Sequence, residues 1–271
     1  MSNDAGQDEK HGSGRVMANS DTSRMQGHDV AAALGLLTRL PVPVDGARAA
    51  ARGAASAWAY PLAGVVVGLI AGGVAVVGGW LGLPGGLVAG LVLLATVMVT
   101  GAMHEDGLAD CADGFWGGWD PARRLEIMKD SRIGAYGVIA LVIGIGLRWV
   151  ALTVLLNAGV VWVAVLVPAV ASRAAMVWVM TALPLARRTG LSHAVGRPSP
   201  QAARVAVGVA ALVGFGLTGW SFVLLAAIAA LAVWGSMALA RAKIGGQTGD
   251  VLGATQQVVE IAVLMALVAA G

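Results

Sequence analysis

Residues 134–156 read GAYGVIALVIGIGLRWVALTVLL, and Arg148 is their only charged side chain. A helix needs roughly 20 apolar residues to cross a bilayer, so this stretch has the length and character of a transmembrane helix. The whole chain is 58% hydrophobic, and its mean hydropathy of +0.78 exceeds what soluble domains usually show. The sequence therefore predicts an all-α polytopic membrane helix bundle.

Six other stretches share this apolar character, so seven transmembrane helices are expected. They lie at residues 57–80, 85–103, 134–156, 160–183, 204–219, 221–240 and 251–270. A short interfacial helix is expected before them at residues 29–40, because Pro41 and Pro43 oppose its continuation. Residues 1–28 are polar and are predicted to be a disordered tail, which leaves residues 29–271 as a single integral membrane domain.

Basic loops alternate with uncharged turns along the chain. Lys and Arg fall before the first span and in the segments 104–133, 184–204 and 241–250, while the intervening turns carry none. By the positive-inside rule these three segments and the N-terminus are cytoplasmic, and seven spans then leave Gly271 outside. The net charge of +3 is too small to argue for a nucleic-acid partner, and the single Cys111 excludes an internal disulfide.

The acidic side chains are unevenly distributed. Seven of the fifteen Asp and Glu residues fall between Glu105 and Asp130. Asp106, Asp110 and Asp113 are spaced by four and three residues, so they lie on one stripe of a helix, where their charges repel unless a proton or a cation intervenes. Hard oxygen ligands with few His or Cys nearby favour Mg²⁺, with Mn²⁺ as a substitute. The alternative is a solvated helix end that stops the second span.

Three ordered motifs carry a family resemblance. They are Asp106-Gly-Leu-Ala-Asp110-x-x-Asp113-Gly114, Ile127-Met-Lys-Asp-Ser-Arg-Ile-Gly-Ala-Tyr-Gly137 and Ile244-Gly-Gly-Gln-Thr-Gly-Asp-Val-Leu-Gly-Ala254. Together they resemble the cobalamin synthase family, also called adenosylcobinamide-GDP ribazoletransferase. The segments 37–41 and 60–64 are similar to its N-terminal part, so the resemblance runs from about Leu37 to Glu260.

The resemblance implies a catalytic domain in the bacterial inner membrane with its active site facing the cytoplasm. Such an enzyme joins adenosylcobinamide-GDP to α-ribazole, or to its 5′-phosphate, and releases GMP with adenosylcobalamin or its phosphate. Mg²⁺ on the aspartate stripe would neutralise the diphosphate, with Asp130 either a further ligand or a partner of Arg132. Membrane lipid is the other expected partner, and a homo-oligomer is left open.

Other polar residues are assigned to substrate binding. Lys129 and Arg132 are expected to contact phosphate, although this segment also suits a helix cap with basic anchors. Arg173, inside a predicted span, is a further phosphate ligand, whereas Arg148 is expected to be structural and Glu260 is a candidate partner for either. The loop Gly245, Gly246, Thr248 and Asp250 is expected to turn backbone amides toward an anion, or Asp250 simply caps the helix. Arg187 is expected to anchor lipid headgroups, with contact to a phosphate as the alternative.

Two other classes of protein remain as alternatives. A cation transporter with an aspartate site would place its carboxylates near the middle of the bilayer, whereas these lie at a predicted cytoplasmic boundary. The segment Asp110-Cys-Ala-Asp-Gly114 is also similar to the first half of the motif of CDP-alcohol phosphotransferases, which use aspartates and a divalent metal. The Ala-Arg pair of that motif is replaced here by Gly117-Gly118, and its later aspartates are absent.

Overall fold

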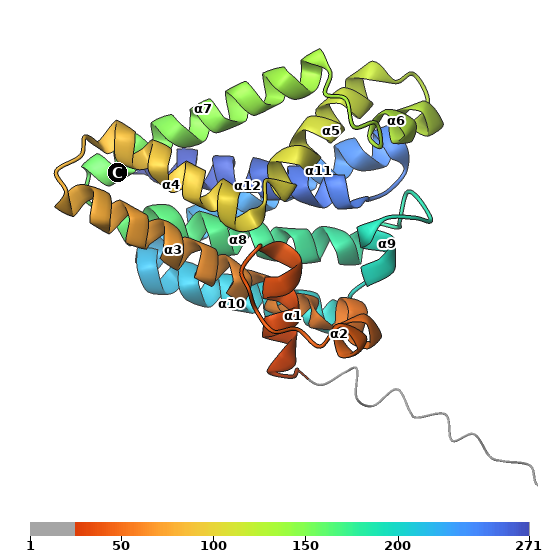
Figure 1. The fold of residues 1–271 in the computed structure, drawn as a ribbon, viewed down its shortest axis with the longest axis horizontal. Coiled ribbons are helices and arrows are strands. Elements are labelled where there is room, and N and C mark those ends of the chain that lie inside the picture. The colour runs from red at the N-terminus through yellow and green to blue at the C-terminus, as the bar shows by residue number, and fades with distance from the viewer. Residues whose placement is uncertain (1–24, 271) are drawn as a thin grey trace, which may run out of the picture.

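The computed structural model describes residues 25–270, and within this range it is helical with no strand (Figure 1). The all-α prediction is confirmed. Residues 1–24 of the predicted tail, and Gly271, which was predicted to lie outside, fall beyond the described range.

All seven apolar helices are present, with boundaries within a few residues of those predicted. They are α3 (Tyr60–Trp80), α4 (Gly85–Thr100), α7 (Ala135–Asn157), α8 (Val161–Ala182), α10 (Pro200–Thr218), α11 (Phe222–Ile244) and α12 (Gly249–Ala270). The predicted interfacial helix is α1 (His28–Leu37), which ends before Pro41.

Counted by length and hydropathy alone, the candidate membrane spans are fewer than the seven predicted. Five stretches of the described chain are long and apolar enough to cross a membrane, which identifies an integral membrane protein. One of them, Pro200–Ile244, contains both α10 and α11, between which the chain reverses at η2 (Gly219–Ser221) (Figure 1). Helix α4 has only 16 residues, about 24 Å at 1.5 Å per residue. It qualifies only together with α5 (Met103–Gly117), which would make six spans.

Short helices begin where the sequence supplies caps. Helix α6 (Pro121–Ile127) follows Asp120, whose carboxylate accepts the amides of Ala122 and Arg123, both at 3.0 Å. Helix α10 follows Ser199, which caps it in the same manner. The remaining short elements are α2 (Gly46–Arg52), η1 (Gly53–Ala59) and α9 (Leu191–Val195).

Glycines on α3 allow the closest approach between long helices. A β-carbon added at Gly64 would lie 2.5 Å from the carbonyl oxygen of Ala169 on α8, and one added at Gly68 would lie 2.8 Å from the side chain of Leu166. Gly72 of α3 faces the ring of Trp162, which is also on α8. Small residues at every fourth position are a common way for helices to pack in lipid, and α3 and α8 use it here.

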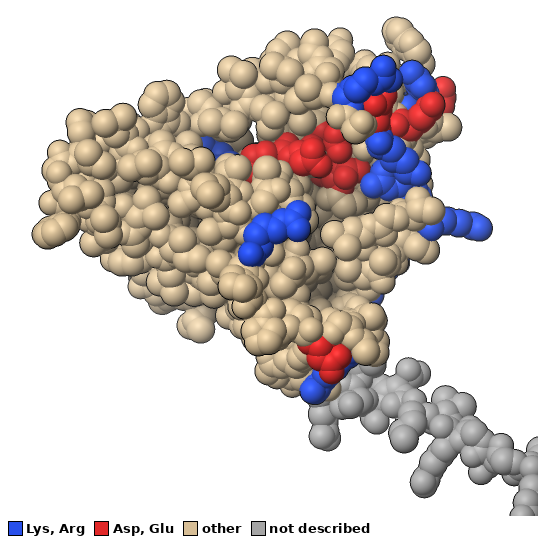
Figure 2. Space-filling view, in the orientation of Figure 1, with Lys and Arg blue, Asp and Glu red and all other residues tan. Residues whose placement is uncertain are grey.

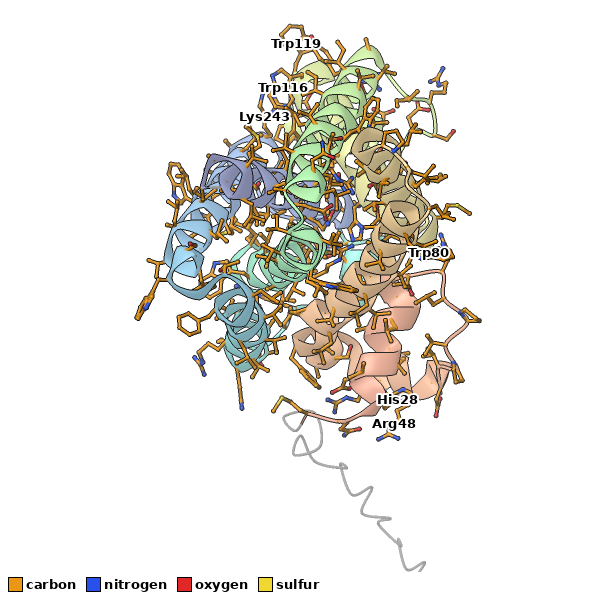
Figure 3. All side chains as sticks on the ribbon, turned by 90° about the vertical axis from the view of Figure 1, so that its left-hand side faces the viewer. His28, Arg48, Trp80, Trp116, Trp119 and Lys243 are labelled. Atoms are coloured by element: carbon orange, nitrogen blue, oxygen red, sulfur yellow. The ribbon has the colours of Figure 1, made fainter. Side chains whose placement is uncertain are left out.

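The three segments predicted to be cytoplasmic meet at one end of the bundle. Arg124 donates to the carbonyl oxygen of Lys243 at 2.9 Å, and the Gln247 amide donates to the carbonyl of Pro184 at 2.8 Å. Lys243 also lies over the Trp116 ring at the same end, 5.2 Å from its centroid (Figure 3). The predicted grouping of residues 104–133, 184–204 and 241–250 on one side is therefore confirmed, whereas which side of the membrane they face stays a prediction.

Candidate functional site

The acidic stripe is carried by a helix that turns sharply out of the bundle. Helix α4 ends at Gly101 and Ala102, which have φ angles of 65° and 57°, and α5 continues at 88° to α4. The left-handed φ of Gly101 favours glycine there, and a β-carbon would also displace the Arg39 side chain that packs against this turn. Helix α5 is not one of the five candidate spans, and it carries four carboxylates, so we place it at the membrane boundary.

The outward face of α5 presents Asp106 and Asp110. Asp106 is exposed and Asp110 is half-buried, one helical turn away. Neither carboxylate accepts a hydrogen bond from the described part of the protein. Figure 2 shows a continuous acidic stripe where α5 lies, below the ridge formed by α7 and beside a group of Lys and Arg side chains. These two aspartates are therefore open to a ligand that approaches from solvent.

Asp250 joins this stripe from the start of α12. A β-carbon added at Gly107 of α5 would lie 2.7 Å from the Asp250 carbonyl oxygen, so only glycine permits this approach. Arg187 donates to the Asp250 carboxylate at 3.1 Å, and Thr248 donates to it at 3.2 Å. Asp250 thus lies next to the stripe, and its ion pair places Arg187 there as well. The pairing of Arg187 with Asp250 was not predicted, because the Arg187-Arg188 pair has the pattern of a lipid anchor.

The clustered charges affect the protonation of Asp110. Burial raises the pKa of its carboxyl to about 7, and the negative charges of Asp106, Asp250 and Asp113 act in the same direction, while Arg187 opposes them. A carboxyl that is half protonated near neutrality attracts a cation, because a bound cation relieves the same repulsion.

Asp113 departs from the other two members of the stripe. Its carboxylate accepts the amides of Gly134 at 2.7 Å and Gly137 at 2.9 Å, at the start of α7. Its side chain is buried and acts as the cap that α7 otherwise lacks. The three aspartates therefore lie on one helix, as predicted, but Asp113 is committed to α7.

The loop that follows α6 forms the basic border of the site. Arg132 pairs with Asp130 at 2.7 Å, and hydrogen bonds from Arg132 lower the pKa of the Asp130 carboxyl to about 2. Of the two roles predicted for Asp130, the structure favours the orientation of Arg132. Lys129 approaches Thr189 at 3.4 Å, which links this loop to the one that holds Arg187. Arg132 is exposed, and its Nη1, which has no partner in the described residues, can contact an anion.

The glycine-rich loop is anchored by its own backbone. The Gln247 carbonyl accepts the Ala186 amide at 2.9 Å, and the Gln247 side chain accepts from Ser192 at 2.7 Å. Gly246 is buried against the Pro184 carbonyl, and Thr248 is buried at the start of α12. Within this loop, Gly245 and Asp250 are more accessible than Gly246 and Thr248, which hold the loop in place.

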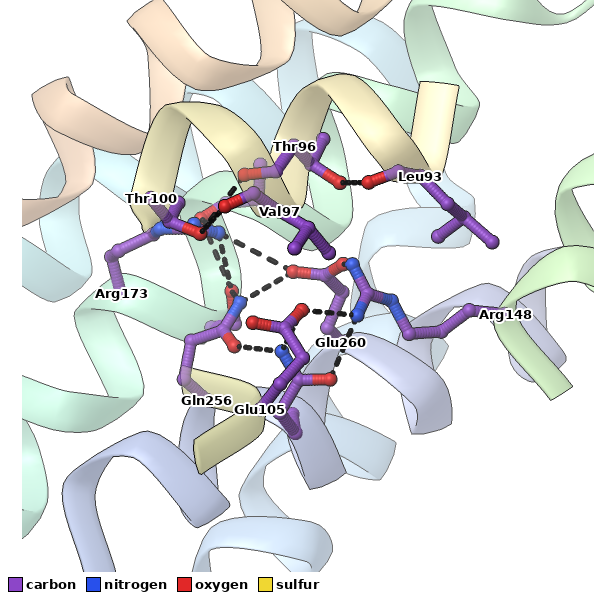
Figure 4. Close-up of polar contacts among 12 residues, drawn as sticks. Leu93, Thr96, Val97, Thr100, Glu105, Arg148, Arg173, Gln256 and Glu260 are labelled. Carbon is purple, nitrogen blue, oxygen red and sulfur yellow. Dashed lines mark hydrogen bonds and ion pairs between the residues drawn. The ribbon is translucent and has the colours of Figure 1, made fainter. Parts of the chain in front are cut away.

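The predicted phosphate ligand Arg173 lies in a different environment. Glu260 of α12 pairs with Arg173 at 3.3 Å and with Arg148 at 2.9 Å, and Arg148 also pairs with Glu105 of α5 at 2.8 Å (Figure 4). Both guanidinium groups are buried behind α4. Arg173 is therefore occupied inside the bundle, because burial of an arginine without a counter-charge is too costly. The predicted pairing of Glu260 is confirmed for both arginines.

The side chains on α5 offer few ligands to a magnesium ion. Within residues 25–270, no three His, Cys, Asp or Glu side chains are grouped closely enough to hold a metal by themselves. Mg²⁺, however, usually takes one or two carboxylates and completes its shell with waters and substrate phosphates. Asp106 and Asp110, both without protein partners, fit that mode of binding.

Most of the chain is similar to a known family and to named proteins of that family. The family described as cobalamin-5-phosphate synthase matches residues 29–268. A protein of Sinorhizobium medicae (strain WSM419) named adenosylcobinamide-GDP ribazoletransferase is 47% identical over 249 residues, covering 88% of this chain and 95% of that protein. Proteins of the same name from Rhizobium meliloti (strain 1021) and Bradyrhizobium diazoefficiens are 46% and 40% identical, covering 88% and 92% of this chain and 95% and 96% of theirs. No solved structure gives a significant match.

Proposed function

The chain belongs to the cobalamin-5-phosphate synthase family, as a transferase of cobalamin biosynthesis, and we propose that it joins adenosylcobinamide-GDP to α-ribazole or its 5′-phosphate. In this reaction the ribazole hydroxyl attacks the phosphorus attached to cobinamide. A new P–O bond forms, the P–O bond to GMP breaks, and GMP departs. The proton of the attacking hydroxyl passes to a carboxylate of the stripe.

The observation that carries this proposal is the unengaged pair Asp106 and Asp110 beside Asp250. Asp106 and Asp110 would hold Mg²⁺ by one carboxylate each. Bound there, Mg²⁺ would neutralise the diphosphate and stabilise the leaving GMP. Arg132, oriented by Asp130, and Arg187, held by Asp250, lie in the two loops that border the stripe and supply cations for the phosphate oxygens.

The site has the openness that a bulky substrate requires. Asp106 and Arg132 are both exposed, and the stripe is visible on the surface of the molecule (Figure 2). The basic loops gather at this end, so we assign it to the cytoplasmic side of the bacterial inner membrane. The observed exposure supports catalysis on soluble substrates rather than an ion site enclosed at the middle of the bilayer.

The test is GMP release by the purified protein from adenosylcobinamide-GDP, α-ribazole and Mg²⁺. Asp106→Asn should lower the rate by on the order of 10²–10³, because it removes one ligand of a transition-state charge. Glu126→Gln is the matched control, since this exposed carboxylate on α6 pairs with Arg123 of the same helix. Absence of GMP would reject the reaction, while an unchanged rate after chelation of Mg²⁺ would reject only the metal site.

A further inference from the structure

An apolar groove lies between α10 and α11, far in the chain from the acidic stripe. The two helices are in contact near their turn, where Gly214 faces the Phe222 ring, and α8 forms the floor of the groove behind them. The groove has a volume of about 430 Å³. Its walls include Ala210 and Ala211 of α10 and Ala229 and Val233 of α11.

The groove lies at membrane depth. It is within the stretch Pro200–Ile244, of which only 6% of the most apolar window is buried inside the protein. Outward-facing side chains of these helices are large and apolar, among them Leu212, Leu224 and Leu231. The groove is therefore surrounded by hydrocarbon, and an apolar occupant can enter it from the bilayer.

Two arginines lie at the end of the groove that is remote from the turn. Arg204 is one turn before the lining residue Val207 on α10, and Arg241 is one turn beyond the lining residue Met237 on α11. Both are exposed, and neither guanidinium has a hydrogen bond or ion pair in the described part of the protein. Lys243, by contrast, already lies over Trp116. The polar end of the groove thus carries two cations without counter-charges.

We propose that this groove binds one anionic phospholipid of the surrounding bilayer. An acyl chain fills the apolar space between α10 and α11, and the headgroup phosphate lies between Arg204 and Arg241. The groove runs along about four turns of α11, from Phe222 to Met237, and a helix about 10 Å across occupies roughly 400 Å³ per turn, so a transmembrane helix of a second copy does not fit inside it. A narrow acyl chain with a negative headgroup matches both the shape and the charge.

The experiment uses the full-length protein in detergent, titrated with phosphatidylglycerol or with phosphatidylcholine of the same acyl chains. Native mass spectrometry counts bound lipids, and the unfolding midpoint reports stabilisation by binding. The wild-type protein should retain one phosphatidylglycerol in preference to phosphatidylcholine. Arg204→Gln with Arg241→Gln should weaken that binding about 30-fold, since each basic side chain near an anionic surface contributes about fivefold. The corresponding pair of Lys variants should keep it.

A groove-filling variant provides the independent arm of the test. Ala229→Phe should abolish retention of the lipid, while Ala227→Phe, on the same helix but outside the groove, should leave it unchanged. Equal retention of the two lipids by the wild-type protein, or undiminished retention by Ala229→Phe, overturns the proposal. Conversion of a dimer to a monomer by Ala229→Phe also overturns it, because the groove would then be an interface between copies.

Discussion

Asp113 allows a stability experiment that separates its structural role from that of its neighbours. Its carboxylate accepts two amides of α7, from Gly134 and Gly137. In Asp113→Asn one of these bonds is lost, because the amide NH₂ cannot accept, and the other goes from a charged to a neutral acceptor. A hydrogen bond to a charged group contributes about 1.5–3 kcal/mol, so we expect the free energy of unfolding to fall by about 2–3 kcal/mol.

Asp106→Asn is the matched comparison for this experiment. Asp106 is exposed and without a protein partner, so its replacement should change the free energy of unfolding by less than about 0.5 kcal/mol while removing most GMP release. Denaturant unfolding in detergent and turnover would be measured on the same preparations. If Asp113→Asn proves as stable as Asp106→Asn, the cap assigned to α7 is wrong, and Asp113 returns to the set of candidate metal ligands.

Three further outcomes are expected. Arg148→Met should destabilise the protein by about 3–5 kcal/mol in the same unfolding assay, because two buried glutamates lose a partner. Because the Asp110 pKa rises from 3.8 to about 7 on folding, the free energy of unfolding of the metal-free protein should fall as pH rises through this range. The unfolding midpoint of Asp110→Asn should not show this part of the fall. A cysteine at exposed Trp119, in a Cys111→Ala background, should resist membrane-impermeant reagents in intact cells and react after lysis; labelling from outside would reverse the topology.

Much of the architecture was predictable because charge and hydropathy report directly on contact with lipid. The predicted apolar stretches became helices, and the basic segments between them meet at one end. The stripe on α5 was also predictable, since spacings of four and three place side chains on one helix face whatever the tertiary structure. These inferences depend only on local geometry and solvation.

The partners of the charged residues were less predictable. Whether Arg173 faces a substrate or Glu260 depends on how α8 and α12 approach each other, and sequence spacing carries no information on that approach. Asp113 became a cap because the 88° turn after α4 and the course of the following loop bring the start of α7 to it. The segment Thr100-Gly101-Ala102 gives little indication of a turn that large.

Helix α5 connects the buried network to the exposed site through adjacent residues. Glu105 faces inward and pairs with Arg148, whereas Asp106 is about 100° further round the helix and faces solvent. The inward ion pair resists rotation of α5, because any rotation that moves Asp106 also separates a buried glutamate from its arginine. Gly107 then admits α12 and brings Asp250 beside the stripe. The intramembrane charges, which would be costly without each other, thus fix the orientation of the carboxylates that face the substrate.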